Sequence, residues 1–371
     1  MTSAKLTTEK LSLLLIDSQK TLDLALSDWV QVIRVFRSEG LLARFAYQLQ
    51  DSGVFKSAPE YAQKHLSSAI KVAQRQVSSV NFESRQIVKA LSSRQAKLYL
   101  LKGAAYCLLN TTFSKGRIFS DIDLLVAKKD LQDIEDTLKL HGWMSEVLSR
   151  YDEAYYREWA HEVPPMKHAG RGTIIDLHHN LYLPISGRAP EIELFLNNAY
   201  ELNGFYILRP AAMTLHSIIH LMLNDDLGHA YRDLNDLHLM FTEFNNETYW
   251  NDLLDLADRS GFADELFLAC RYCQRFFGTN IDKKHAALLS NMHNMGKLSL
   301  YFLDKLFVVA LSPKHPLVKR KLAGLSEFLI VTRAHLKKMP VHILIYHLVH
   351  KLCRYLLESL MGKAFFEKTN P

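Results

Sequence analysis

Cysteine is scarce in this sequence, with four residues in a chain of 371. So few cysteines exclude a small fold held together by disulfide bonds. Cys270 and Cys273 form a CxxC pair, but they lie in LFLACRYCQRFF, whose apolar residues have helical spacing. A structural zinc site would need two further ligands, and no second pair is nearby. We therefore interpret the pair as part of a packed helix.

Long hydrophobic runs are missing as well. No stretch approaches the ~18 uninterrupted apolar residues of a membrane span. The first residues lack the pattern of a signal peptide, because the apolar run LLLI is short and acidic Asp17 follows it at once. Internal repeats and low-complexity segments are also absent. These absences favour a globular protein in a reducing cytoplasm.

Acidic residues are scarce only at the C-terminal end. The formal net charge is +6, but residues 296–371 contain thirteen Lys and Arg against four Asp and Glu. The rest of the chain is therefore slightly acidic. We expect the C-terminal region to form a helical bundle with a basic face toward solvent. Peripheral contact of that face with an anionic membrane or another polyanion is the alternative.

Hydrophobic periodicity divides the chain into four regions. Apolar residues recur every three or four positions in 1–95, in 206–295 and in the basic region 296–371, which predicts helices. Region 96–205 instead contains short apolar runs, an amphipathic helical segment and a Gly-rich turn between two further strands. The expected fold class is α+β, with a central mixed sheet and its helices flanked by N-terminal and C-terminal helical regions.

Two acidic residues interrupt the apolar run RIFSDIDLLV, which predicts a strand. Alternate side chains of a strand share a face, so Asp121 and Asp123 point the same way while Ile122 and Leu124 point into the core. Carboxylates about 7 Å apart repel each other, and burying them without a cation is costly. Oxygen ligands of this kind suit Mg²⁺. A turn or cap pair is the ordinary alternative for a lone DxD.

A third carboxylate changes this balance. Asp176 lies in TIIDLHHNL, a second predicted strand, and by the same alternation His178 shares its face. Three aspartates on two strands can hold two divalent ions, Mg²⁺ or Mn²⁺. We take Asp121, Asp123 and Asp176 as candidate metal ligands and catalytic residues. His178 either orients Asp176 or contacts a substrate, unless it is a packed strand histidine.

Residues that could hold phosphate precede the DxD strand. Lys102 and Gly103 end the strand KLYLLKG, and the next helix begins at once, presenting free N–H groups to an anion. Arg117, four residues before Asp121, could reach a triphosphate. A solvated strand-end lysine and a loop arginine are the alternatives for these two cations.

These motifs resemble the nucleotidyltransferase superfamily of the DNA polymerase β type. The closer resemblance is to a bacterial group of uncharacterised nucleotidyltransferases, through LKGAAY, SDIDLLV and DLHHNL and the later LHSIIH and RDLNDL. It covers roughly residues 10–250. The resemblance implies that 96–205 is a nucleotidyltransferase-like core. It also implies a Mg²⁺-dependent transfer of NMP from an NTP to a hydroxyl acceptor, with pyrophosphate released and Asp176 activating the acceptor.

The first motif departs from that superfamily. Its usual Gly-Gly or Gly-Ser is Lys102-Gly103 here, which leaves open how the triphosphate is held. The acceptor is equally open: a protein, a sugar or another hydroxyl compound.

Two other functions compete with the transferase. One is a DxD glycosyltransferase, against which the helical region 1–95 counts. The other is a non-catalytic nucleotide-binding or scaffold protein, linked to cell-surface polysaccharide synthesis.

Three other patterns have ordinary structural interpretations. His216 and His220 have the i, i+4 spacing of metal ligands, but their apolar helix favours buried, hydrogen-bonded histidines. Arg232 and Asp236 are one helical turn apart, which predicts an ion pair on a solvated helix face, although Arg232 could approach a phosphate. Aromatic residues gather in the predicted loop 149–165. They either stack on a base or acceptor, or cover the sheet.

Overall fold

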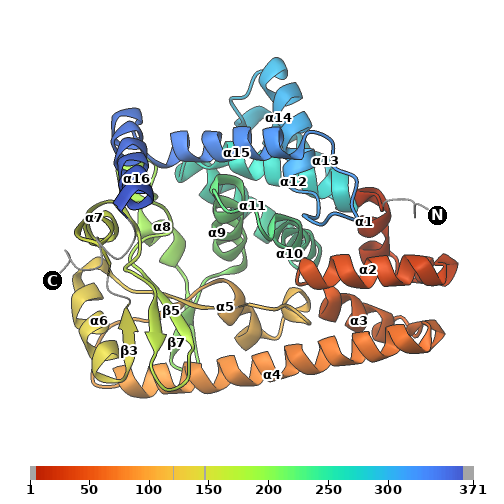
Figure 1. The fold of residues 1–371 in the computed structure, drawn as a ribbon, viewed down its shortest axis with the longest axis horizontal. Helices are drawn as coiled ribbons and strands as arrows, with labels where there is room; N and C mark the ends of the chain where they lie inside the picture. The colour runs from red at the N-terminus through yellow and green to blue at the C-terminus, as the bar shows by residue number, and fades with distance from the viewer. Residues whose placement is uncertain (1–5, 120, 146–147, 362–371) are drawn as a thin grey trace.

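The fold is α+β and was obtained as a computed structural model that describes residues 6–119, 121–145 and 148–361. Seven short strands form one mixed sheet, and helices surround it (Figure 1). The strands are β1 (Tyr99–Leu100), β2 (Asp121–Leu125), β3 (Trp143–Ser145), β4 (Met166–His168), β5 (Ile174–His178), β6 (Tyr200–Leu202) and β7 (Phe205–Ile207).

Most of the described residues are helical. The N-terminal helices are α1 (Thr8–Ile16), α2 (Leu26–Ser38), α3 (Leu42–Asp51) and α4 (Glu60–Leu91). Helices among the strands are α5 (Lys102–Leu109), α6 (Leu131–Leu140), α7 (Arg150–Ala154), which continues as a π-helix over Tyr155–Trp159, and α8 (Ile192–Leu196). After the sheet follow α9 (Pro210–Leu223), α10 (Ala230–Glu243), α11 (Glu247–Arg259), α12 (Ala263–Phe277), α13 (Lys283–Met292), α14 (Lys297–Ala310), α15 (Ala323–Lys338) and α16 (Val341–Met361).

The sheet order is β3-β4-β5-β2-β1-β7-β6. Strands β2 and β5 are parallel neighbours at its centre, and β1 pairs antiparallel with β2 on the other side. The long helix α4 runs along one side of the molecule beside α5 and α6 (Figure 1). Helices α9 and α10 lie on the opposite side of α5, so the start of α5 is enclosed between the sheet and two helical layers.

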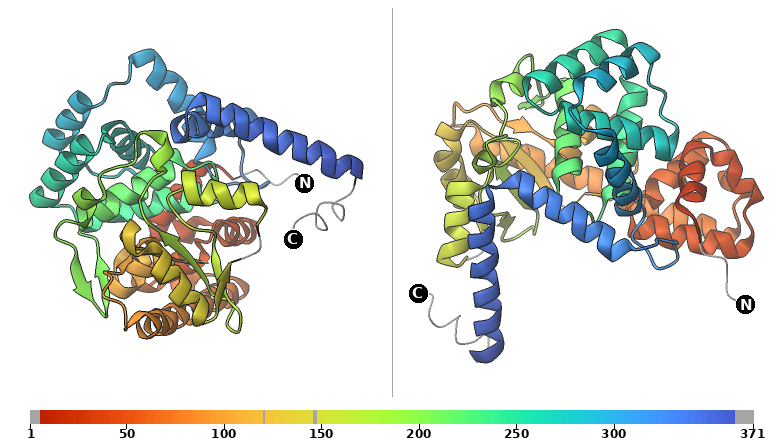
Figure 2. Two further views of the ribbon diagram at one scale, coloured as in Figure 1. Left: turned by 90° about the vertical axis from the view of Figure 1, so that its left-hand side faces the viewer. Right: turned by 90° about the horizontal axis from the view of Figure 1, so that it is seen from above.

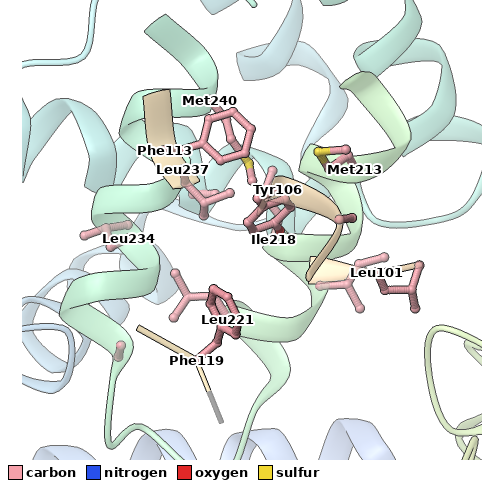
Figure 3. Packing of buried hydrophobic residues seen from close by; sticks show 14 of the residues in the cluster. Leu101, Tyr106, Phe113, Phe119, Met213, Ile218, Leu221, Leu234, Leu237 and Met240 are labelled. Atoms are coloured by element: carbon pink, nitrogen blue, oxygen red, sulfur yellow. The ribbon is translucent and has the colours of Figure 1, made fainter. Parts of the chain in front are cut away.

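The core beneath this junction joins α5, α9 and α10. Tyr106 of α5, Ile218 of α9 and Leu237 of α10 are buried side by side, and Phe113 closes the cluster (Figure 3). Burying a large apolar side chain contributes about 1.5–3 kcal/mol relative to leaving it exposed. This packing therefore fixes the position of α9 and α10 relative to the first strands.

Most of the elements predicted from periodicity are present. Gly40 separates α2 from α3 and has a left-handed conformation (φ +69°). Both strands around the Gly-rich turn at 169–172 form an antiparallel pair, β4 and β5. The three-residue strands β3, β6 and β7 were not predicted. The loop expected over 149–165 was wrong in part, since residues 150–159 are helical.

The C-terminal region contains the expected helices, with Pro313 and Pro316 between α14 and α15 and Pro340 between α15 and α16. Fewer of its positive charges are free at the surface than its composition suggests, because some are paired with acidic side chains. Lys337 forms an ion pair with Glu265 and Lys338 with Asp225, which uses both cations on the body of the protein. Helix α16 instead exposes apolar side chains along its length and extends away from the body (Figure 2). Its contact with a membrane or polyanion stays a prediction.

No helix in the described part of the chain is both long and apolar enough to pass through a lipid bilayer.

Glu39 ties the N-terminal helices to the C-terminal region. It ends α2, is 1% exposed, and its Oε1 accepts a hydrogen bond from the backbone N–H of Lys314 at 2.7 Å. Burial raises the pKa of the Glu39 carboxyl to about 7, against the opposing effect of that hydrogen bond and of nearby cations such as Arg320. The folded protein therefore holds a proton here that the unfolded chain releases near pH 4.5.

Glu39 should make the protein less stable as the pH rises. Because its pKa is higher in the folded state, its contribution is complete below pH 4.5 and is lost as the pH rises to about 7. We expect Glu39→Gln to gain about 3 kcal/mol of unfolding free energy relative to wild type between pH 4.5 and pH 8. Urea unfolding of both proteins across this range measures the difference. A constant difference would contradict the assignment.

Candidate active site

The pairing of β2 with β5 brings the predicted carboxylates together. In the parallel register, Asp123 lies directly opposite Asp176, and Asp121 lies two residues back on the same strand. Adjacent strands are about 4.8 Å apart, so Asp123 and Asp176 point from one face as near neighbours. The sheet thereby confirms the shared face inferred from alternation.

Asp123 is the most deeply buried of the three aspartates, at 4% exposure. Its Oδ1 accepts hydrogen bonds from Lys102 Nζ at 2.7 Å and from His178 Nε2 at 3.1 Å. Burial alone would raise the pKa of Asp123, but the Lys102 ammonium and the His178 imidazole hold it well below its usual range. Asp123 is therefore ionised, with two positively polarised partners on one oxygen. His178 contacts Asp123 rather than Asp176.

The other two aspartates have no such partners. Burial, and then the negative charge of Asp123, raises the pKa of both Asp121 and Asp176. Asp176 Oδ1 is buried and has no hydrogen-bond partner among the described residues. Buried polar atoms almost always have a partner, so this oxygen indicates a place for a bound group.

A fourth carboxylate, Glu162, was missed by the sequence analysis. Its Oε2 lies 3.2 Å from Nδ1 of His178, on the ring edge opposite Asp123. The preceding residue, His161, also faces His178, with ring centroids 5.3 Å apart. Both residues lie in an irregular segment between the π-helix and β4, where no periodic pattern marks them. The dipeptide His-Glu beside the Tyr-rich stretch was the available signal.

A cavity of about 580 Å³ opens onto Asp121 and Asp123. Lys102, Gly103 and Arg117, the residues predicted to hold phosphate, all line it, and their binding of a nucleotide stays a prediction. Further walls come from α2, α4, α9 and α10 and include Arg37, Gln76, His220 and Arg232. Asp176 and His178 do not line this cavity. They lie on the neighbouring strand. Asp121 and Asp123 therefore border the cavity, whereas Asp176 and His178 lie toward Glu162.

Lys102 has a strained backbone. Its φ of +43° is in the left-handed region, which lysine rarely adopts and glycine adopts freely. The following Gly103 has an ordinary φ, but a Cβ there would lie 3.1 Å from the Phe119 side chain. Gly103 is therefore needed for the packing of Phe119 against α5. The lysine side chain is directed at Asp123, and the ion pair offsets the strain.

Arg117 is held by a buried network of charges. Its Nε lies 2.9 Å from Asp236 Oδ2 and its Nη2 lies 3.4 Å from Asp233 Oδ1. Asp236 also accepts a hydrogen bond from Arg44 at 2.6 Å. Arg117 Nη1 is buried and has no hydrogen-bond partner among the described residues. A buried, unpartnered guanidinium nitrogen in the wall of a cavity is suited to bind an anion.

The ion pair predicted between Arg232 and Asp236 was wrong. Arg232 pairs with its neighbour Asp233, and Asp236 is buried at 3% exposure against Arg44. This face of α10 is covered by α3 and by the segment before β2, so it is not solvated. Arg232 does line the cavity, which leaves its predicted approach to a phosphate open.

The histidines of α9 also border the site. His216 is 5% exposed, and His220 lines the cavity together with Ser217. The positive charge of Lys102 and then burial lower the pKa of His220 to about 3, so the ring is neutral. The helix thus packs beside the site and supplies neutral polar groups rather than further charge.

The aromatic residues at 151–159 contact the C-terminal helix. Tyr151 stacks on His350 of α16 at 3.7 Å between centroids, and its hydroxyl lies 2.6 Å from His347 Nδ1. Tyr155 and Trp159 extend this cluster toward α16. These aromatics therefore pack against a helix rather than against the central strands. Burial, followed by the negative charges of Glu162 and Asp176, raises the pKa of Tyr156.

The donor set suits a hard divalent cation. Four carboxylates (Asp121, Asp123, Asp176 and Glu162) lie near one ammonium group, that of Lys102, and the imidazole ring of His178, so acidic groups outnumber basic groups in the cluster. Burial, followed by the negative charge of Asp123, raises the pKa values of Asp121 and Asp176. Carboxylate oxygens beside a polar cavity are the ligands that Mg²⁺ and Mn²⁺ prefer.

An acidic pair on one strand, a third carboxylate on its parallel neighbour and a helix start facing a polar cavity form a site suited to phosphoryl transfer. The family model of an uncharacterised nucleotidyltransferase matches residues 26–278. Since this is more than half of the chain, the protein belongs to that nucleotidyltransferase family. No curated protein matches the chain significantly.

Gly116 sets the path of the segment that carries Arg117. It has φ +73°, and a Cβ there would lie 2.4 Å from the backbone nitrogen of Arg44. Gly53 has a similar φ of +76° but nothing within 4 Å, which makes it a matched control for the backbone strain alone. Both substitutions by alanine incur about 1–2 kcal/mol of conformational strain.

We expect Gly116→Ala to lower the unfolding free energy by about 1–3 kcal/mol more than Gly53→Ala, because only the former overlaps with backbone atoms. Chemical denaturation of the two variants measures this. Equal losses would contradict the close approach of Gly116 to α3.

Proposed function

We propose that the protein transfers an NMP group from an NTP to a hydroxyl acceptor and depends on Mg²⁺ or Mn²⁺. The main support is the register of β2 and β5, which sets Asp123 beside Asp176 with Asp121 on the same face. Membership of a nucleotidyltransferase family supports the same class of reaction. The acceptor is a protein, a sugar or another hydroxyl compound.

Asp121, Asp123 and Asp176 would hold the metal ion. When bound, Mg²⁺ supplies positive charge that neutralises the phosphates and lowers the barrier to phosphoryl transfer. The protein's own contribution is positioning and charge. The triphosphate would lie in the cavity, near the start of α5 and within reach of Arg117 and Arg232. The acceptor would approach from the side of Asp176, which does not line that cavity.

In the proposed step, the acceptor oxygen forms a bond to the α-phosphorus of the NTP. The bond from that phosphorus to the oxygen bridging it to the β-phosphate breaks, and pyrophosphate leaves with the electron pair. The hydroxyl proton passes to a carboxylate on the acceptor side, for which Asp176 is the candidate. No electron transfer and no further reactant is needed.

One observation favours the non-catalytic nucleotide-binding alternative. Lys102 places an ammonium 2.7 Å from Asp123, where a ligand of the metal ion would be needed. A protein that had given up catalysis could keep this ion pair in place of a metal. In the transferase, Lys102 must leave Asp123 when the metal–nucleotide complex binds, and it is then free to contact a phosphate.

The transferase is tested by incubating the protein with α-labelled NTPs, Mg²⁺ or Mn²⁺ and a cell lysate. We expect label to move to a lysate component with wild type and with the control Asp255→Asn/Asp258→Asn, whose aspartates are exposed on α11. The variant Asp121→Asn/Asp123→Asn should lose at least 100-fold of this rate. A metal-dependent thermal shift with nucleotide but no transfer would support the non-catalytic alternative instead.

Lys102 gives a second prediction. Lys102→Gly removes the competing ammonium and relieves the left-handed strain, so Mg²⁺ should stabilise the nucleotide-free variant at roughly tenfold lower concentration than wild type. The same variant should bind NTP more weakly, because a phosphate contact is lost. Thermal melting against Mg²⁺ concentration, with and without NTP, separates the two effects. Unchanged Mg²⁺ dependence would contradict the competition between Lys102 and the metal.

A further inference from the structure

A second group of metal-ligand atoms lies on the far side of His178 from Asp123. Donor atoms of His161, Glu162 and His178 are all within 4.8 Å of one another. Glu162 Oε2 is 3.2 Å from His178 Nδ1 and 3.9 Å from His161 Nε2. Among the described residues, no other three side chains of His, Cys, Asp or Glu bring their donor atoms this close together. The three aspartates do not form such a group by themselves.

Backbone pairing holds these three residues in place. Glu162 forms a bridge with His178 of β5, and the N–H of Val163 donates to Leu177 O at 2.9 Å. The N–H of His179 donates to His161 O at 2.8 Å. The side chains of His161 and Glu162 are 22% and 28% exposed, which leaves a path for an ion, whereas His178 is almost fully buried at 4%.

Two features of the histidine rings point to a ligand here. The His161 ring has a buried Nδ1 with no hydrogen-bond partner among the described residues, and its other nitrogen, Nε2, lies toward Glu162. His178 meanwhile has its other nitrogen, Nε2, on the Asp123 carboxylate at 3.1 Å. A carboxylate behind a histidine is the common outer-shell arrangement of metal-binding histidines, since it fixes the ring and makes the ligating nitrogen more basic.

We propose that His161, Glu162 and His178 bind a divalent transition-metal ion at a site separate from the three aspartates. Two imidazole nitrogens and one carboxylate favour Mn²⁺, Fe²⁺, Co²⁺ or Zn²⁺ over Mg²⁺, which prefers oxygen ligands. The Glu162 oxygen lies 3.2 Å and 3.9 Å from the two histidine nitrogens, and all three donor atoms lie within 4.8 Å of one another, so the side chains would have to move closer together around an ion with bonds of about 2.1 Å.

The site adds to the proposed function without depending on it. His178 and Asp176 are two residues apart on β5, so an ion at His178 would lie on the side from which we expect the acceptor to approach. Such an ion would supply positive charge to an acceptor hydroxyl or to an anionic group beside it. The transferase needs only the aspartates, so either assignment can fail alone.

Co²⁺ titration of the purified full chain in a large excess of Mg²⁺ tests the proposal. Co²⁺ reports nitrogen ligands through its visible absorption, and Mg²⁺ occupies the oxygen-only site. We expect one Co²⁺ to bind with such a spectrum. His161→Gln and Glu162→Gln should each weaken Co²⁺ binding at least 10-fold. Removal of an outer-shell partner alone costs about 10-fold or more in metal affinity, and loss of a ligand should cost at least as much. The control His141→Gln, an exposed residue at the end of α6, should bind Co²⁺ like wild type.

The outcomes separate the two assignments. Asp121→Asn should keep the Co²⁺ spectrum and lose transfer of label from NTP. Absence of a Co²⁺ spectrum in wild type, or unchanged binding in both His161→Gln and Glu162→Gln, would overturn the metal site and leave the transferase intact. A normal Co²⁺ spectrum in a protein that transfers no label would uphold the metal site and overturn the transferase. Melting curves show whether each variant is folded.

Discussion

The burial of Asp123 at the centre of the sheet is the constraint on which the rest of the site depends. An ionised carboxylate at 4% exposure persists only with a positive charge or hydrogen-bond donors beside it, and the fold supplies these partners from two directions. Lys102 approaches from the start of α5, and His178 from the next strand. The strained backbone of Lys102 and the double engagement of His178 are both consequences of this one buried charge.

A second buried charge network positions the opposite wall of the cavity. Arg44 of α3 and Arg117 share Asp236 of α10, and Gly116 brings the intervening segment against the backbone of α3. Breaking one member of such a network leaves an uncompensated buried charge, which costs about 3–5 kcal/mol. The apolar cluster of α5, α9 and α10 packs these helices together (Figure 3). The cavity walls on the sides of the sheet and of α10 are therefore held by buried contacts.

The sequence allowed the carboxylates to be predicted but not all of their partners. Period-two alternation assigns Asp121 and Asp123 to one face, and an acid in a second apolar run identifies Asp176, because both signals are local. Glu162 is brought to the site by a backbone bridge to β5, a long-range contact that leaves no periodic trace. The helical spacing of Arg232 and Asp236 was correct, but which face of α10 is covered depends on α3 and could not be inferred from α10 alone.

The elements of the fold that were predicted wrongly are also those for which the local sequence carries too little information. Strands β3, β6 and β7 are three residues long, too short for an alternating pattern to differ from chance. The helical stretch at 150–159 is stabilised by stacking on α16, nearly two hundred residues later in the chain, so its aromatic composition suggested a loop or a platform. In this helical stretch, tertiary contact overruled local propensity.

The walls of the cavity come from more than one part of the chain. Its walls include Arg37 of α2 and Gln76 of α4, and the N–H₂ of Gln76 donates to the carbonyl of Phe119 next to the DxD strand. The sheet that carries the carboxylates therefore does not contain a complete pocket. A gene fragment encoding only the strands and α5 would transplant the acids without the surface that selects a ligand. Changes in ligand preference over evolution can accordingly arise in helices far from the carboxylates in sequence, while the acidic strand pair stays as it is.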